Sequence, residues 1–185
     1  MYVAQKLTPA VLSKARETER EGRFYPEARV PARDRAQLED YRGTGWDRGH
    51  LAEAAAMPNP DAMAQSFSLA NIVPQAPSQN RGAWAKNVEA ATRRFVARGH
   101  EAYVVTGPLY LADAPPRMIG ANKVRVPDRL FKLVYVPAQC RAWVHMMDNH
   151  DEARAGKPLS YAEFEQMTGV RWLGSEAFSK CGPRT

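Results

Sequence analysis

The stretch from Tyr41 to His50 has the sequence YRGTGWDRGH and carries more chemistry than any other part of the chain. It places the imidazole of His50 close to the guanidinium of Arg48, so a group that exchanges protons near neutral pH lies beside one that binds anions. The glycines allow tight turns and the close approach of a ligand. Alone, the string is only moderately specific, because a histidine is more often buried and hydrogen-bonded.

A second informative stretch, residues 71–84 with the sequence NIVPQAPSQNRGAW, leads into a predicted helix. From Trp84 to Arg98 apolar residues recur at helical spacing, and Gly99 is suited to end the helix. Asn80 therefore lies near the start of a helix. Taken by itself, an asparagine at that place favours a capping role over a catalytic one.

The remaining elements follow from periodicity and from turn residues. A capped helix is expected from Thr8 to Glu21, and residues 22–47 are expected to be mostly loop because Arg, Asp, Gly and Pro dominate them. Strands are typical of runs rich in β-branched and aromatic residues. The further elements that we expect are a short helix at 61–67, strands at 68–74, 102–106, 130–136 and 141–147, and a helix beginning with a capping box near Ser160 and ending at Gly169.

Composition limits the class of protein. The 185 residues fit one domain, 1–185, and no run of about 20 apolar residues is present, so insertion into a membrane is not expected. The formal net charge of +6 is compatible with a polyanionic partner and equally with simple solubility. Cys140 and Cys181 are the two cysteines; the sequence leaves open whether they form a disulfide or remain thiols.

Together the two stretches resemble one family. The order Asp47-Arg48-Gly49-His50, then Asn-x-x-Pro-Gln from Asn71, then Asn80 and Trp84, is similar to the DNA/RNA non-specific endonucleases. These form the sugar-indiscriminate branch of the ββα-metal, or His-Me finger, nucleases, which includes mitochondrial endonuclease G. The resemblance implies an α+β fold with a central antiparallel sheet flanked by helices, and hydrolysis of phosphodiester bonds in DNA and RNA substrates.

The resemblance also implies roles for individual residues. His50 matches the general base that takes a proton from the attacking water, and Asn80 matches the side-chain ligand of a single Mg²⁺, with Mn²⁺ as a substitute. Arg48 matches the arginine that binds phosphate or stabilises its transition state. Asn71 matches a polar residue near the active centre, and we group it with Arg81 as a substrate-binding candidate.

One position departs from the family pattern. Relatives carry a glutamate eight residues after the metal asparagine, where it orients water on the ion, but here Val88 occupies that position and Glu89 follows it. A shift of one residue turns a side chain by about 100° around an α-helix. Glu89 is therefore a catalytic candidate only if the helix starts differently or contains a bulge, and otherwise it is a solvent-facing glutamate.

Further expectations concern substrate contacts and biology. An upstream phosphate-binding arginine is assigned to Arg23, with Arg29 and Arg42 as competitors, and Arg42 is kept as a substrate-binding candidate. The family usually has one more strand before Tyr2, so the chain is expected to lack that strand. No signal peptide is visible; a secreted or periplasmic location and an inhibitor protein are suggested by resemblance only. The alternative function is a catalytically impaired nucleic-acid-binding protein on the same scaffold.

Overall fold

A five-stranded antiparallel sheet forms the centre of the protein, with strand order β1-β4-β7-β8-β9. The computed structural model describes residues 1–179, so Cys181, and with it the open question of its pairing with Cys140, lies outside the described residues. The strands of this sheet are β1 (Val3–Leu7), β4 (Ala102–Leu109), β7 (Arg129–Val136), β8 (Arg141–Asp148) and β9 (Leu159–Ser160). The predicted α+β class with a central antiparallel sheet is confirmed.

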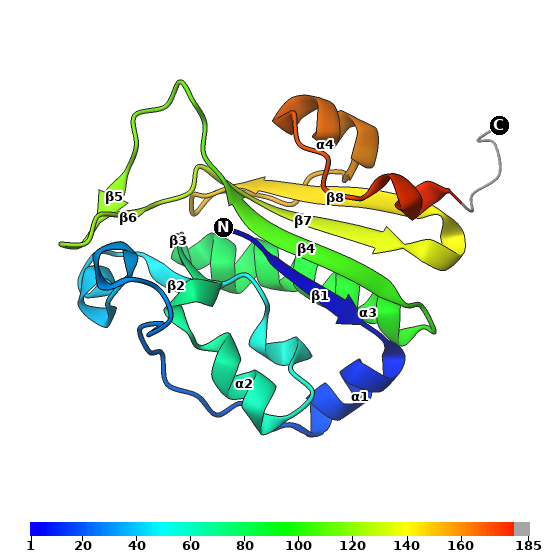
Figure 1. Ribbon diagram of the computed structural model, residues 1–185, viewed down its shortest axis with the longest axis horizontal. Coiled ribbons are helices and arrows are strands. Elements are labelled where there is room, and N and C mark those ends of the chain that lie inside the picture. The colour runs from blue at the N-terminus through cyan, green and yellow to red at the C-terminus, as the bar shows by residue number, and fades with distance from the viewer. Residues whose placement is uncertain (180–185) are drawn as a thin grey trace.

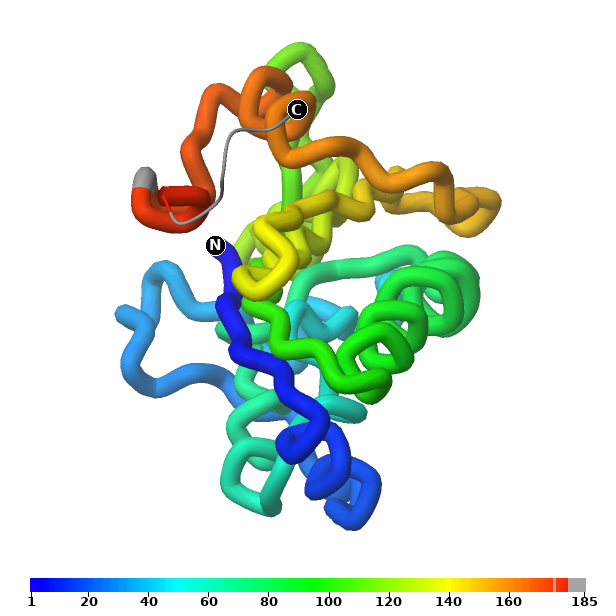
Figure 2. Tube along the Cα trace, turned by 90° about the vertical axis from the view of Figure 1, so that its right-hand side faces the viewer, coloured from blue at the N-terminus to red at the C-terminus, as the bar shows by residue number. Residues whose placement is uncertain are grey.

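Helices cover the two faces of the sheet. The helices are α1 (Pro9–Glu17), α2 (Pro60–Ser66), the π-helix η5 (Gln79–Glu89), α3 (Ala90–Ala97) and α4 (Tyr161–Thr168). Short 3₁₀ turns are η1 (Ala32–Asp34), η2 (Leu38–Tyr41), η3 (Ala54–Ala56), η4 (Leu69–Asn71), η6 (Pro137–Gln139) and η7 (Ser175–Phe178). Helix α4 lies on one side of the five-stranded sheet, and helices α1, α2 and α3 lie on the other side (Figures 1 and 2).

The alternation of side chains along β7 explains this two-sided arrangement. Leu130 packs with Val88 of η5, whereas its neighbour Phe131 packs with Phe164 of α4. Successive residues of a strand point to opposite faces, so a strand that is apolar at nearly every position must be covered on both sides. The hairpin of β7 and β8 was predicted from the sequence, and it is confirmed.

A second, two-stranded sheet carries the motif Asp47-Arg48-Gly49-His50. Strand β2 (Asp47–His50) pairs antiparallel with β3 (Ile72–Gln75), and η5 follows β3 directly, which gives the β-β-helix order of the predicted unit. Gly49 is required here because a Cβ at this position would lie 2.0 Å from the side-chain oxygen of Gln75. A third small sheet pairs β5 (Met118–Ile119) with β6 (Val124–Arg125).

Several predicted boundaries were wrong. Helix α1 ends at Glu17 rather than Glu21, although its cap at Thr8 is confirmed by the hydrogen bond from the Val11 amide. Pro74 does not stop the strand but lies within β3, where a two-stranded sheet leaves one edge of each strand without a hydrogen-bonding partner. The predicted helix at 84–98 begins earlier, at Gln79, so Asn80 lies inside a helix and not at its cap.

Within residues 1–179, no helix combines the length and the apolar character needed to cross a bilayer.

Candidate active site

A cavity of about 340 Å³ brings together residues from four segments of the chain. Its lining includes His50 and Arg48 from β2, and Asn80, Arg81 and Glu89 from η5. All five were candidates from the sequence, and they lie up to 41 residues apart along the chain. The other polar lining residues are Arg20 and Glu53. The structure therefore collects most of the predicted site in one place.

His50 is enclosed by aromatic rings. The centre of its ring lies 5.5 Å from that of Phe24 and 5.1 Å from that of Phe67. Burial, and then the positive charge of Arg20, lower the pKa of His50 from 6.5 to about 4, so the imidazole is neutral at physiological pH. Its Nε2 atom is buried and has no hydrogen-bond partner among the described residues. A neutral imidazole with an unengaged nitrogen is suited to accept a proton.

The carboxamide of Asn80 is oriented by Asp47. Asn80 Nδ2 donates to Asp47 Oδ2 at 2.9 Å, and Arg81 Nε donates to the same oxygen at 2.7 Å. An ionised carboxylate only accepts hydrogen bonds, so the amide nitrogen must be the atom that faces Asp47. The amide oxygen of Asn80 is left for another partner, and a hard oxygen of this kind suits Mg²⁺.

The donor set fits a sparsely held magnesium ion. Among the described residues, no group of three His, Cys, Asp or Glu side chains is arranged to hold a metal. Mg²⁺ usually keeps several of its waters and needs few protein ligands, so one amide oxygen in a polar cavity is compatible with it. Zinc would need a fuller set of nitrogen or sulfur ligands.

Glu89 reaches the cavity because η5 is a π-helix. Such a helix bonds each carbonyl to the amide five residues on, as in the bond from the Ala90 amide to the Ala85 carbonyl. A π-turn takes in nearly one residue more than an α-turn, so two turns span about nine residues instead of about seven. Asn80 and Glu89 are nine residues apart and therefore share a face. Val88 is buried in the core, so of these two neighbouring residues it is Glu89 that lines the cavity.

Arg48 is held by stacking. Its guanidinium carbon lies 5.1 Å from the ring centre of Phe24 and 5.9 Å from that of Tyr41. Arg48 Nε is buried and has no partner among the described residues. A guanidinium fixed by aromatic faces and left with open donors is a ready binder of phosphate oxygens.

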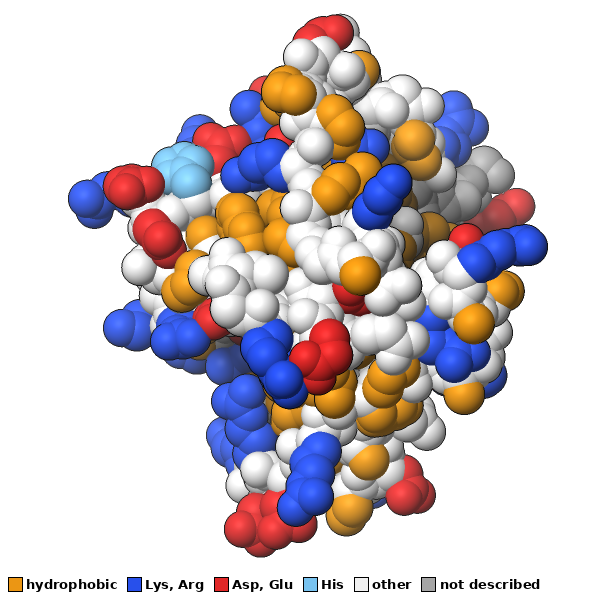
Figure 3. Space-filling view, turned by 90° about the vertical axis from the view of Figure 1, so that its left-hand side faces the viewer, with side chains coloured by type: hydrophobic (Ala, Val, Ile, Leu, Met, Phe, Trp, Pro, Cys, Tyr) orange, Lys and Arg blue, Asp and Glu red, His pale blue; other side chains and the backbone are white. Residues whose placement is uncertain are grey.

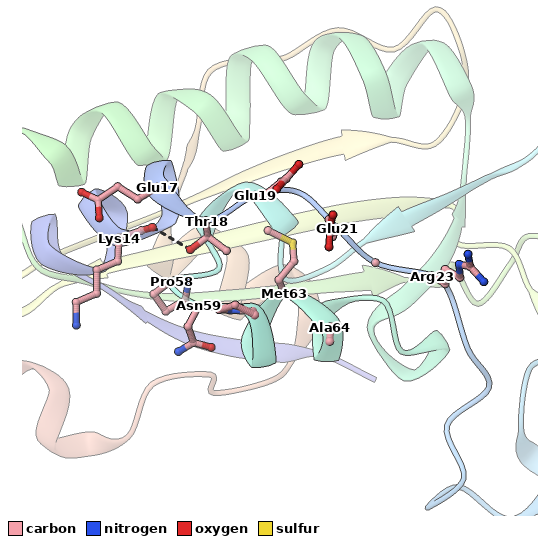
Figure 4. Close-up of a pocket in the computed structure, with 12 residues that line it drawn as sticks. Lys14, Glu17, Thr18, Glu19, Glu21, Arg23, Pro58, Asn59, Met63 and Ala64 are labelled. Carbon is pink, nitrogen blue, oxygen red and sulfur yellow. Dashed lines mark hydrogen bonds between the residues drawn. The ribbon is translucent and has the colours of Figure 1, made fainter.

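Three predicted residues lie outside this cavity. Asn71 is buried and uses its side chain to bond the Ala52 amide at 2.9 Å and the Ala52 carbonyl at 3.0 Å, which fixes the chain just after His50. Arg42 is exposed and pairs with Glu39 at 2.9 Å. Arg23 lines a different, larger cavity of about 900 Å³ between the end of α1 and the start of α2 (Figure 4).

Two cavity residues were not predicted from the sequence. Arg20 lies three residues before Arg23 and lines this cavity, whereas Arg23 does not, and sequence spacing within a loop could not choose between the two arginines. Glu53 lies three residues after His50, is 4% exposed and forms an ion pair with Arg93 of α3. A carboxylate in the apolar run after His50 was the only signal for it.

Basic side chains are also found beyond the cavity. Figure 3 shows lysine and arginine side chains gathered along the lower left edge of one face, where few acidic side chains lie between them. Such a distribution is compatible with a polyanionic partner.

Comparisons with known proteins agree with the geometry. Human mitochondrial endonuclease G is 38% identical over 147 residues, which cover 75% of this chain and 49% of that protein. Mitochondrial nuclease EXOG of Xenopus laevis is 39% identical over 123 residues, covering 62% and 34%. A nuclease of Nostoc sp. is 35% identical over 137 residues, covering 73% and 47%. The chain thus spans half or less of the length of these relatives.

Solved structures give the same result. A chain in the crystal structure of the EndoG/EndoGI complex matches with a TM-score of 0.82 and 28% identity, covering 92% of this chain and 77% of that chain. The predicted secreted or periplasmic location finds no support in the relatives, since endonuclease G and EXOG are named mitochondrial. The family model described as DNA/RNA non-specific endonuclease matches residues 1–173, and the chain belongs to this family.

Proposed function

We propose that the protein is a Mg²⁺-dependent endonuclease that hydrolyses phosphodiester bonds of DNA and RNA, with Mn²⁺ able to replace Mg²⁺. The observation that carries the proposal is the convergence of His50 and Asn80 on one cavity, with an unengaged imidazole nitrogen on one residue and an unengaged amide oxygen on the other. A base and an oxygen ligand for a hard cation are the two protein groups that this hydrolysis needs.

His50 takes the proton of the attacking water. Its low pKa keeps it neutral before substrate binds, and the negative charge of an arriving phosphodiester favours the imidazolium and so opposes the effect of Arg20. The base therefore becomes stronger when substrate is present. Arg48 and Arg20 bind the phosphate oxygens, on which charge increases in the transition state.

Asn80 holds the ion, and Asp47 holds Asn80. When bound, Mg²⁺ supplies positive charge that stabilises the leaving 3′-oxygen. Glu89 accepts hydrogen bonds from water in the cavity, and Arg81, fixed by Asp47, adds positive charge at the rim. These contacts are to phosphate and water, so we expect cleavage with little sequence preference and strong dependence on salt concentration.

The alternative of an impaired binding protein rested on two observations, the shifted glutamate and the missing N-terminal strand. The first loses its weight, because the π-helix turns Glu89 to the face that carries Asn80. The structurally similar chain belongs to the EndoG/EndoGI complex, which shows an inhibited EndoG, so we also expect this chain to bind an inhibitor protein.

Cleavage of supercoiled plasmid and of a long RNA, with Mg²⁺ and with EDTA, tests the proposal. His50→Ala is expected to slow cleavage by about 10²–10⁴-fold, the usual contribution of a positioned base. The matched control is His150→Ala, because the side chain of His150 is 52% exposed and lies outside the cavity. Melting temperatures show that both variants fold. Cleavage by His50→Ala at the parent rate, or cleavage undiminished by EDTA, would refute the proposal.

A further inference from the structure

A row of polar side chains crosses the sheet on the side that faces η5 and α3. Thr106 of β4 is the register partner of Lys132 of β7, and Lys132 is in turn the partner of His145 of β8. Lys132 is two residues after Leu130 on β7, so its side chain points to the same face of the sheet as that of Leu130, which packs against η5. Its side chain is 1% exposed, and its Nζ donates to Thr106 Oγ1 at 3.0 Å. An ammonium so deeply buried is costly unless a counter-charge is near.

Glu89 supplies the counter-charge. Burial lowers the pKa of Lys132 to about 8, and the carboxylate of Glu89 acts against this shift, whereas Arg93 adds to it. Burial likewise raises the pKa of Glu89, and three effects act against the rise: first the charge of Lys132, then a hydrogen bond from Trp84, and last the charge of Arg20. His145 is half-buried, and this burial lowers its pKa, so it brings no charge near neutral pH.

The two other positive charges that act on Glu89 or Lys132, those of Arg93 and Arg20, are either paired elsewhere or exposed to solvent. Arg93 forms its ion pair with Glu53, so it is not the principal partner of Glu89. Arg20 is exposed and lies on the solvent side of the cavity, where water screens its charge. No ion pair within 4.0 Å joins Lys132 to Glu89 in residues 1–179. Leu130, on the same face of β7 as Lys132, packs with Val88, the residue before Glu89, so Lys132 lies on the side of the sheet that this end of η5 covers.

We propose that Lys132 is a positioning residue for Glu89: from the sheet face that η5 covers it keeps the half-buried carboxylate ionised and thereby able to accept hydrogen bonds from water at the site. The inference rests on the proposed function, because it assigns Glu89 a task in the same reaction. Thr106 contributes by fixing the direction of the ammonium. The reaction itself needs no contact between Lys132 and substrate.

The direct test is an NMR titration of the Glu89 carboxyl carbon in metal-free protein. A neighbouring positive charge commonly lowers the pKa of a carboxyl group by about one to three units. In Lys132→Met the titration midpoint of Glu89 is expected to rise by at least about one unit. The matched control is Lys86→Met. This variant removes an exposed lysine from η5, the helix that carries Glu89, and should leave the titration midpoint of Glu89 unchanged. An unchanged midpoint in Lys132→Met overturns the proposal.

Cleavage rates close the test through a double-mutant cycle. Lys132→Met is expected to reduce the rate by about tenfold near neutral pH and to recover at higher pH, where Glu89 ionises without help. In a Glu89→Gln background the same substitution should have no further effect, because its target is gone. Equal losses in both backgrounds, or a loss that is the same at every pH, would show a merely structural role for Lys132.

Two further variants keep the outcome readable. Thr106→Val leaves both charges in place and removes the anchor of the ammonium, so a smaller loss, about threefold, should also disappear in the Glu89→Gln background. This variant replaces Lys132→Met in the cycle if the latter does not fold. Failure of the proposed function has a different signature: His50→Ala would then cleave at the parent rate, whatever the result for Lys132.

Discussion

The protonation of His50 should be visible in the stability of the protein, independently of catalysis. The imidazole lies between Phe24 and Phe67, and burial together with Arg20 lowers its pKa from 6.5 to about 4. An unfolded chain has no such environment, so its histidine regains the ordinary pKa. Replacing His50 by glutamine removes the titrating group while keeping a polar side chain in the site.

The sign follows from proton counting. Between about pH 6.5 and about pH 4 the unfolded histidine binds a proton and the folded one does not, so acid favours unfolding in this range. Above about pH 6.5 both forms are neutral, and His50 then has no effect on the pH dependence. A shift of about 2.5 units at about 1.4 kcal/mol per unit predicts that the parent loses about 3 kcal/mol through His50 across this window.

Urea unfolding in EDTA at several pH values measures the effect. The free energy of unfolding of the parent minus that of His50→Gln should fall by about 3 kcal/mol from about pH 7 to about pH 4. Other groups, including His145 and the buried carboxylates, titrate in both proteins and cancel in the difference. His150→Gln, at an exposed position, should give a flat difference. A flat difference for His50→Gln as well would mean that the site does not desolvate the imidazole.

Three other perturbations examine the surroundings of the site. Asp47→Asn replaces a pure acceptor by a side chain that also donates, so Asn80 is no longer held in one orientation; we expect at least a tenfold loss of cleavage and weaker Mg²⁺ binding by calorimetry. Arg20→Ala should raise the pKa of His50 in an NMR titration and reduce the salt dependence of DNA binding by about one phosphate contact. Gly49→Ala should lower stability in thermal unfolding by about 2–4 kcal/mol, since the new Cβ meets a buried glutamine side chain at 2.0 Å.

The parts of the site that lie on regular local structure could be predicted from the sequence. His50 and Arg48 are in one short motif, and Asn80 lies at a fixed distance before an amphipathic helix, so their chemistry is visible without coordinates. Arg20 could not be found in this way. It lies in an irregular segment after α1, where no periodicity fixes which arginine turns toward the cavity, and the choice of Arg23 had only approximate spacing behind it.

For Lys132 the sequence predicts the strand correctly but not the charged residue that the side chain meets. The strand at 130–136 was expected, and a lysine within its apolar run is an anomaly that can be noticed. Alternation places the side chain on one face, but only the packing of the helix on that face shows which charge it meets. The helix that carries this charge, that of Glu89, is the π-helix η5, and a π-helix cannot be predicted from amino-acid composition.

The π-helix links these observations. A family pattern of eight residues between the two helical site residues assumes one helical period, whereas the face that a side chain occupies depends on the residues per turn as well as on their number. In η5 the wider turn accommodates nine residues and keeps Asn80 and Glu89 on one side, while Val88 enters the core. The wider turns of the helix thus accommodate the one additional residue between Asn80 and Glu89, and both side chains still line the cavity. Two changes, one in spacing and one in helical period, compensate each other, and a test of spacing alone would have rejected a glutamate that lines the cavity.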